Sequence, residues 1–115
     1  MVFEVRHYVS AAGANVFFEW FAALADRRAQ ARIQARIDRI ERGLFGDCEP
    51  VGEGVWELRI DWGPGYRVYY ARAGETILLL LCAGDKRKQQ ADIKRAKDYW
   101  HDYKERTKPK GKGSG

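Results

Sequence analysis

The chain of 115 residues is long enough for one domain with a modest core and too short for two. Its 45% hydrophobic content and four tryptophans exclude a disordered chain, and its longest apolar run, residues 77–83, is too short to span a bilayer. The formal net charge of +5 fits a polyanionic partner such as RNA or DNA, and it fits an ordinary basic surface equally well.

Two features bear on where the protein works. The first residues include Glu4, Arg6 and His7, which is unlike the start of a secretory signal peptide. Cys48 and Cys82 are isolated in the sequence, which suits a reducing compartment better than a disulfide framework. We therefore expect a cytoplasmic protein without membrane association.

The first part of the chain predicts one strand and two helices. Alternation of apolar and polar residues predicts a strand over residues 2–9, and helical spacing predicts a helix over residues 14–24. Asp26 is a suitable N-cap for a second helix that runs to about residue 42, where Gly43 provides a stop signal. The predicted core stripe of this second helix consists of Ala29, Ile33, Ile37 and Ile40.

A row of arginines runs beside that stripe. Their spacing of three or four residues places them on one flank of the helix. This flank is either a solvated surface with local ion pairs to Asp38 and Glu41, or a surface that follows phosphates or docks an acidic partner. The sequence leaves both interpretations open for Arg28, Arg32, Arg36 and Arg39.

Residues 56–71 read W-E-L-R-I-D-W-G-P-G-Y-R-V-Y-Y-A and predict a β-hairpin. Residues 63–65, Gly-Pro-Gly, supply the turn, because proline fixes φ and glycine tolerates positive φ. Successive strand side chains alternate between the two faces of a sheet. Arg59, Arg67 and Tyr69 therefore share the face that the apolar residues leave open, close enough together to act on one anionic ligand.

The remaining segments complete an α+β domain. Residues 47–54 predict a loop, and residues 76–83 predict a strand that is apolar without alternation, so that both of its faces are covered. Asp85 is a suitable cap for the next segment, and residues 89–104 predict a final helix. The expected order is β-α-α-β-β-β-α, an antiparallel-rich sheet backed by a helical pair and a C-terminal helix. One domain spans residues 1–106, and the Lys/Gly-rich residues 107–115 form a disordered tail.

The residues available for chemistry exclude several mechanisms and favour one. His7 and His101 are far apart and no spacing resembles a ligand set, so we expect neither a metal nor another cofactor. Cleavage of RNA by its own 2′-hydroxyl needs a proton acceptor, cations for the charge that gathers on phosphorus, and a donor to the leaving oxygen. The predicted catalytic set is Arg59, Arg67, Tyr69 and Lys86.

Each member of this set has a role and an alternative. The two arginines suit bidentate contacts to phosphate, Tyr69 suits base stacking or proton transfer, and Lys86 lies where it could reach the same cleft. In the plainer interpretation the strand arginines are only solvated or paired with Glu57 or Asp61. Residues 86–112 carry eleven Lys or Arg against four Asp or Glu, and the predicted RNA contacts among them are Arg87, Lys88, Lys94 and Arg95.

The hairpin, followed by I-L-L-L-L-C-A-G-D-K and then Q-Q-A-D-I-K-R-A, resembles the RelE/ParE superfamily of toxins from type II toxin–antitoxin modules. Within it the chain is most similar to the phage-associated addiction module killer proteins, often called HigB-like. The resemblance covers residues 2–103. The segments G-P-G-Y-R-V-Y-Y and G-D-K-x-x-Q-x-x-D-I are specific to that branch.

The resemblance implies a RelE-like fold and a small cytoplasmic toxin that cleaves mRNA on the ribosome. It also implies inhibition by a cognate antitoxin of the helix-turn-helix type. Arg67 occupies the place of the superfamily arginine that supports the phosphate, and Arg59 matches a second basic position. Ribonuclease relatives often carry His or Tyr after the fourth predicted strand, whereas this chain has Asp85 and Lys86 there. That departure leaves the general acid and base open, and inhibition of DNA gyrase or RNA binding without catalysis remain the alternatives.

Overall fold

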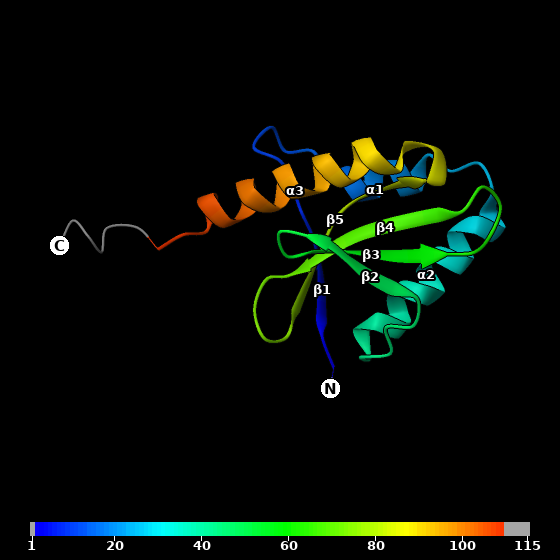
Figure 1. Cartoon of the computed structure of the whole chain (residues 1–115), viewed down its shortest axis with the longest axis horizontal. Helices are drawn as coiled ribbons and strands as arrows, with labels where there is room; N and C mark the ends of the chain where they lie inside the picture. Colours follow the sequence, from blue (N-terminus) through cyan, green and yellow to red (C-terminus); the bar gives the residue numbers. More distant parts are fainter. Residues whose placement is uncertain (1, 110–115) are drawn as a thin grey trace.

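The computed structural model describes residues 2–109, so residues 110–115 of the tail predicted over 107–115 lie outside them. Figure 1 shows a sheet with helices packed against it. None of the helices in this part of the chain is long and apolar enough to cross a membrane. The elements in chain order are β1 (Glu4–His7), α1 (Val16–Ala22), α2 (Arg27–Glu41), β2 (Cys48–Gly52), β3 (Val55–Ile60), β4 (Tyr66–Arg72), β5 (Ile77–Asp85), a 3₁₀ turn (Lys86–Lys88) and α3 (Gln89–Arg106).

The five strands form one mixed sheet in the order β1-β5-β4-β3-β2. β1 runs parallel to β5, while the pairs β2–β3, β3–β4 and β4–β5 are antiparallel. The α+β class and the antiparallel-rich sheet are therefore confirmed. The observed order, β-α-α-β-β-β-β-α, has one strand more than the predicted order.

The additional strand is β2, within residues 47–54, for which the sequence predicts a loop. That prediction is wrong because it takes Pro50 and Gly52 as loop signals. β2 lies at the edge of the sheet, where a proline without an N–H leaves no neighbouring strand unpaired. Pro50 lies opposite Trp56 in β3, and the register shifts between Pro50 and Gly52.

The helix boundaries follow the capping residues. Asp26 caps α2, as predicted, by accepting hydrogen bonds from the backbone N–H groups of Arg28 and Ala29. α1 is shorter than predicted because it starts only after Asn15, whose side chain accepts a hydrogen bond from Phe18 N. The first strand is also shorter than residues 2–9, since its pairing with β5 ends at His7.

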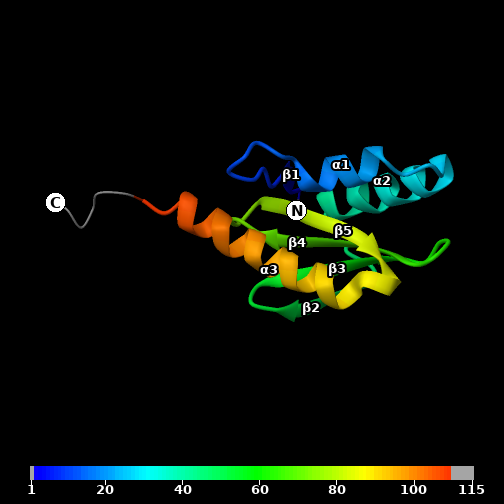
Figure 2. The same ribbon diagram turned by 90° about the horizontal axis from the view of Figure 1, so that it is seen from above.

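Two cores lie on opposite faces of the sheet, and Figure 2 shows α1 and α2 on one side of it and α3 on the other. Side chains of α2, Leu58, Val68 and Leu80 pack together on the first face. Tyr69, Leu79, Leu81 and α3 pack together on the second. The prediction that the last strand is covered on both faces is therefore confirmed.

Candidate active site

The central hairpin places the predicted arginines opposite each other. Arg59 on β3 faces Arg67 on β4 in the antiparallel register, so their side chains emerge side by side on the α3 face of the sheet. Arg67 in turn lies opposite Gly84, and Tyr66 lies opposite Asp85 near the end of β5. The carboxyl end of β5 therefore reaches the turn end of the hairpin, where the 3₁₀ turn begins.

Glu57 joins these side chains. Its carboxylate is buried, with only 1% of the side chain exposed. One oxygen, Oε1, accepts hydrogen bonds from Arg59 Nε and from Arg67 Nη1, both at 3.1 Å. The other, Oε2, accepts from the Tyr69 hydroxyl at 3.1 Å and from Gln89 Nε2 at 2.8 Å. All four donors come from different elements or strand positions, so Glu57 fixes their mutual geometry.

The environment of Glu57 favours its charged form. Burial by itself raises the pKa of this carboxyl, because desolvation penalises the charge. The hydrogen bonds from Arg59 and Gln89 and the positive charge of Arg67 outweigh that effect, so the pKa of Glu57 lies below its ordinary value. Burial of a carboxylate costs free energy through desolvation. Cationic and neutral hydrogen-bond donors around Glu57 offset that cost, which an isolated buried carboxylate would bear in full.

Arg59 is held mainly by acidic neighbours. Its guanidinium pairs with Glu57, contacts the Glu49 carboxylate, and lies 3.7 Å from Asp47 Oδ1. The hydrogen bond to Glu57, together with the charge of Glu49, raises the pKa of Arg59. The side chain is 32% exposed. Arg59 therefore retains little unpaired positive charge for a ligand, and the plainer interpretation of this residue as an ion-pair partner holds for the ligand-free chain.

Arg67 and Tyr69 lie deeper than Arg59. Only 13% of the Arg67 side chain is exposed, and its buried Nε has no hydrogen-bond partner among the described residues. Tyr69 has no exposed surface, and burial together with the charge of Glu57 raises its pKa well above the ordinary value. The prediction that Tyr69 stacks on a base is not supported, because a fully buried ring offers no face to a ligand. Its position beneath Glu57 gives it a structural role.

Lys86 reaches the same place from the end of β5. Its backbone N–H donates a hydrogen bond of 2.8 Å to Gly65 O, which ties the 3₁₀ turn to the hairpin turn. The exposed side chain lines a pocket of about 230 Å³. The structure thus brings together three of the four predicted catalytic residues. The lining residues are Asp47, Arg59, Ile60, Asp61, Gly65, Tyr66, Arg67 and Lys86.

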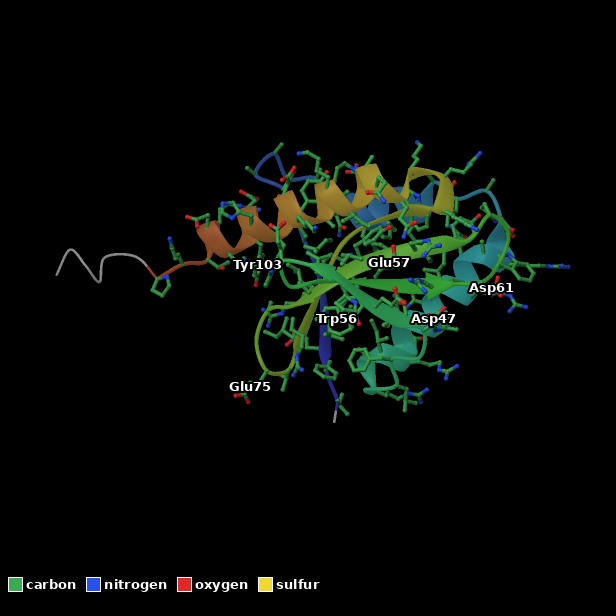
Figure 3. All side chains as sticks on the ribbon, in the orientation of Figure 1. Asp47, Trp56, Glu57, Asp61, Glu75 and Tyr103 are labelled. Carbon is green, nitrogen blue, oxygen red and sulfur yellow. The ribbon has the colours of Figure 1, made fainter. Side chains whose placement is uncertain are left out.

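The two acidic residues that line the pocket come from different segments of the chain, Asp47 from before β2 and Asp61 from directly after β3. Figure 3 shows Asp47 and Asp61 toward one end of the sheet, with Glu57 farther in. Among residues 2–109, no three His, Cys, Asp or Glu side chains converge as a metal-ligand set. The chemistry that this pocket offers is that of guanidinium, ammonium and carboxylate groups.

Asp85 does not take the place of the missing His or Tyr. Its carboxylate accepts hydrogen bonds from the backbone N and the guanidinium of Arg87, at 2.7 to 3.2 Å. These bonds hold the pKa of Asp85 below its ordinary value. Asp85 therefore caps the 3₁₀ turn, as predicted, and its oxygens are already occupied.

The predicted RNA contacts are dispersed over the 3₁₀ turn and α3. Arg87 pairs with Asp85, Lys94 with Asp98, and Arg95 with the buried Asp92. Lys88 is exposed and has no carboxylate partner within the described part of the chain. Three of the four predicted RNA contacts are therefore paired with aspartates in the ligand-free chain, and α3 carries charges of both signs.

Three residues that build the site were not predicted from the sequence. Glu57 was expected only as a possible partner of the strand arginines, and Gln89 and Asp92 had no expected role. Asp92 is buried against Gly84, where an added Cβ would collide with Asp92 Oδ2. The signal that could have revealed Gln89 and Asp92 is the motif G-D-K-x-x-Q-x-x-D-I, which contains both of them together with Gly84, whereas Glu57 lies outside it.

The fold and the pocket define a class of small α+β proteins with a mixed sheet between helices and an arginine pair on the central hairpin. Residues 19–100, more than half of the chain, match the family described as "Phage derived protein Gp49-like (DUF891)". The chain belongs to this Gp49-like family, a RelE/ParE-type toxin family of toxin–antitoxin modules. It is also similar to an uncharacterised protein of Haemophilus influenzae, with 49% identity over 81 residues that cover 70% of this chain and 82% of that protein.

Proposed function

We propose that this protein is a HigB-like toxin of a type II toxin–antitoxin module that cleaves mRNA on the ribosome without a metal ion. It acts in the cytoplasm and is inhibited by a cognate antitoxin of the helix-turn-helix type. The observation that carries the proposal is the pocket of a toxin-family chain in which two strand arginines and Lys86 meet. We also propose that the chain has the RelE-like topology, to which β2 adds one strand at the edge of the sheet.

Arg67 is the group that binds the scissile phosphate. Glu57 engages one of its terminal nitrogens, so the rest of the guanidinium fork can contact phosphate oxygens. Because Glu57 also holds Arg59, the two guanidinium groups are oriented before the substrate arrives. Preorganised cations of this kind stabilise the charge that develops on phosphorus without reorganising during the reaction.

The proton transfers fall to residues that line the pocket. A carboxyl group is ionised at neutral pH and so is free to accept a proton. Lysine and tyrosine, with ordinary pKa values near ~10, are mainly protonated at that pH and cannot. Asp61 is exposed and forms no ion pair within residues 2–109, while Asp47 is close to Arg59. We assign the base to Asp61: it takes the 2′-hydroxyl proton as that oxygen attacks phosphorus. The bond to the 5′ oxygen breaks, and Lys86 donates a proton to it, leaving a 2′,3′-cyclic phosphate and a 5′-hydroxyl.

A second candidate function, inhibition of DNA gyrase without chemistry, has one observation in its favour. Asp47, Glu49, Glu57 and Asp61 surround the three cations, so the pocket as a whole carries no excess positive charge. A protein surface of balanced charge suits docking on another protein as well as it suits an RNA phosphate. This candidate predicts stalled replication with intact transcripts.

The experiment that tests cleavage is mapping of RNA 5′ ends in cells after brief induction of the wild type and of Arg67→Ala. We expect new 5′ ends inside translated frames with the wild type, and about 100-fold fewer or none with the variant. Growth arrest with undisturbed transcripts would remove the nuclease proposal and favour gyrase. RNA binding without new ends in either strain would favour the non-catalytic alternative.

A matched substitution separates loss of chemistry from loss of folding. Arg72→Ala removes an exposed arginine from the other end of the same strand, far along β4 from the pocket, and should leave the new 5′ ends unchanged. Arg67→Lys keeps the charge but loses the planar fork, so we expect partial activity. Equal loss of cleavage with Arg72→Ala would contradict the assignment of Arg67.

A further inference from the structure

α2 and the residue that follows it carry six arginines, and the carboxylates near them, Asp26 beside Arg28 and Asp61 in the groove, lie outside ion-pair distance. None of them forms an ion pair with any residue of the described part of the chain. The arginines on α3 contrast with them, since Arg95 and Arg106 pair with aspartates one helical turn away. The six unpaired arginines are Arg27, Arg28, Arg32, Arg36, Arg39 and Arg42.

The charges of α2 are separated between its two flanks. Asp38 and Glu41 line a groove on the flank that faces β1 and α1. The opposite flank, which faces β3, lines another groove of about 310 Å³ through Arg32, Arg36 and Arg39. The interpretation of the arginine row as a flank with ion pairs to Asp38 and Glu41 is therefore wrong, because these acids lie on the other flank.

Two of these arginines are fixed by contacts that leave their charge in place. Arg36 Nη1 donates a 2.6 Å hydrogen bond to Arg59 O, and Nη2 donates to Phe45 O at 3.2 Å, which attaches α2 to β3. The Arg32 guanidinium lies 4.0 Å from the ring centroid of Trp62. Neither carbonyl oxygens nor an aromatic ring cancel a positive charge, so the flank stays cationic and partly preordered.

The groove lined by Arg32, Arg36 and Arg39 meets the candidate active site around the turn end of the hairpin, since α2 covers the face of the sheet opposite to α3. Ile60 and Asp61 line both the groove beside α2 and the pocket that holds Arg67 and Lys86. A ligand that occupies the pocket and extends past Asp61 therefore meets the α2 flank next. Over the length from Arg28 to Arg39 the helix extends this surface by roughly 16 Å, at about 1.5 Å per residue.

We propose that Arg28, Arg32 and Arg39, hereafter the arginine flank, bind the sugar–phosphate backbone of the same RNA strand that enters the pocket. The inference rests on the proposed function and adds a substrate-binding surface to it. The three side chains are exposed and contact phosphates several nucleotides away from the scissile bond. Contacts to phosphates alone give affinity and position without base preference.

The surface fits RNA better than an acidic protein. Stable protein interfaces place aromatic or aliphatic anchors at their centre, whereas nucleic-acid interfaces are polar and strongly positive. Between the arginines of the groove, Ala35 and Ile60 are the apolar residues, and Ile60 is only 4% exposed. Arg32 stacked on Trp62 also resembles the cationic and aromatic pairs that hold single strands.

The test is fluorescence anisotropy with single-stranded 2′-O-methyl RNA, which cannot be cleaved because the attacking hydroxyl is blocked. The full chain is titrated against an oligonucleotide of about 12 nucleotides and one of about 3, over a series of salt concentrations. We expect Arg28→Gln/Arg32→Gln/Arg39→Gln to bind the long RNA about tenfold more weakly. Its slope of log K against log salt should fall by about 2, and binding of the short RNA should not change.

The matched control is Arg27→Gln/Arg72→Gln/Lys104→Gln, which removes the same charge from exposed positions outside both the flank and the predicted RNA contacts. Equal weakening in both variants would overturn the inference, because net charge would explain it. The inference would also be overturned if the flank variant kept the RNA affinity of the wild type but lost binding to an acidic partner protein.

The outcome is independent of the proposed cleavage. If Arg67→Ala abolishes the new 5′ ends while the flank variant binds the long RNA like the wild type, the inference fails and the proposed function stands. If the wild type produces no new 5′ ends but the flank variant still binds the long RNA more weakly than the wild type, the proposed function fails. The arginine flank then remains an RNA-binding surface.

Discussion

The two faces of the central hairpin both bury side chains, but one face buries apolar groups and the other buries a charged network. Leu58 and Glu57 are neighbours on β3 with 0% and 1% relative exposure, yet they point to opposite sides of the sheet. Leu58 packs among aliphatic and aromatic side chains under α2. Glu57 gathers two arginines, a tyrosine and a glutamine under α3. The hairpin therefore stabilises the fold on one face and arranges charged groups on the other.

The difference lies in what each face loses when it is altered. An apolar side chain contributes through the area and volume that it fills, and its loss leaves a cavity. A buried carboxylate costs desolvation energy that its hydrogen-bond partners must offset, and its loss leaves those partners unsatisfied. Substitutions on the Leu58 face should thus change stability alone, while those on the Glu57 face should change stability and activity together.

The largest expected effect is that of Glu57→Ala. Removal of this carboxylate strands the partly buried Arg67 and the buried Tyr69 without their acceptor. We expect the free energy of unfolding to fall by about 3–5 kcal/mol. Urea denaturation followed by circular dichroism measures it, and growth arrest on induction should be lost at temperatures at which the variant is still folded.

Leu58→Ala is the control from the opposite face. It should cost about 2–5 kcal/mol through the lost transfer energy and the cavity, yet retain growth arrest under conditions in which it is folded. If Glu57→Ala proved as stable as the wild type, the network would not contribute to the fold. If Leu58→Ala abolished growth arrest while folded, the separation of the two faces would be wrong.

A somewhat smaller effect is expected at Gly84, where β5 passes under α3. A Cβ at this position would collide with Asp92 Oδ2, and Asp92 is buried and bound to Arg95. We expect Gly84→Ala to lower the free energy of unfolding by about 1–3 kcal/mol and to displace the start of α3. Because Gln89 on that helix bonds to Glu57, cleavage of RNA should fall as well.

Gly74→Ala provides the comparison for a glycine that no neighbour restricts. The nearest side-chain atom to its added Cβ would be Ile77 Cδ1 at 3.9 Å, and its φ is not in the left-handed region. This variant should be as stable as the wild type or more stable by about 0.4–1 kcal/mol. Equal destabilisation of both variants would show that the contact with Asp92 is not the cause.

Much of this arrangement could be predicted from local sequence patterns. Alternation on the hairpin correctly predicts that Arg59, Arg67 and Tyr69 share a face, and the N-cap at Asp26 marks the start of α2. Such predictions succeed because period and capping depend on neighbours along the chain. Whether a side chain on that face is exposed depends on α3, which covers Tyr69 from a distant part of the sequence.

The failures have the same origin. β2 carries loop-forming residues, and only its position at the sheet edge makes them acceptable in a strand. The acidic partners of Arg59 come partly from Asp47 and Glu49, in the segment predicted as a loop, so the charge balance of the pocket could not be derived from the hairpin. Likewise, the exclusion of Asp38 from the arginine flank depends on which side of α2 faces β3.

The smallest expected effect concerns pH and distinguishes the charge of Glu57 from its hydrogen bonds. Its pKa is lowered in the folded protein, so its contribution to stability is complete above the ordinary carboxyl pKa near 4.5 and is lost as the pH falls through the folded value. Glu57→Gln has no such titration. The difference in unfolding free energy between wild type and variant should shrink between pH 5 and pH 3, by at most about 1.4 kcal/mol per pH unit. Urea denaturation across that range measures it, with Leu58→Ala as the control whose deficit stays constant. A deficit of Glu57→Gln that stayed constant would mean that the buried carboxylate acts through shape and hydrogen bonding alone.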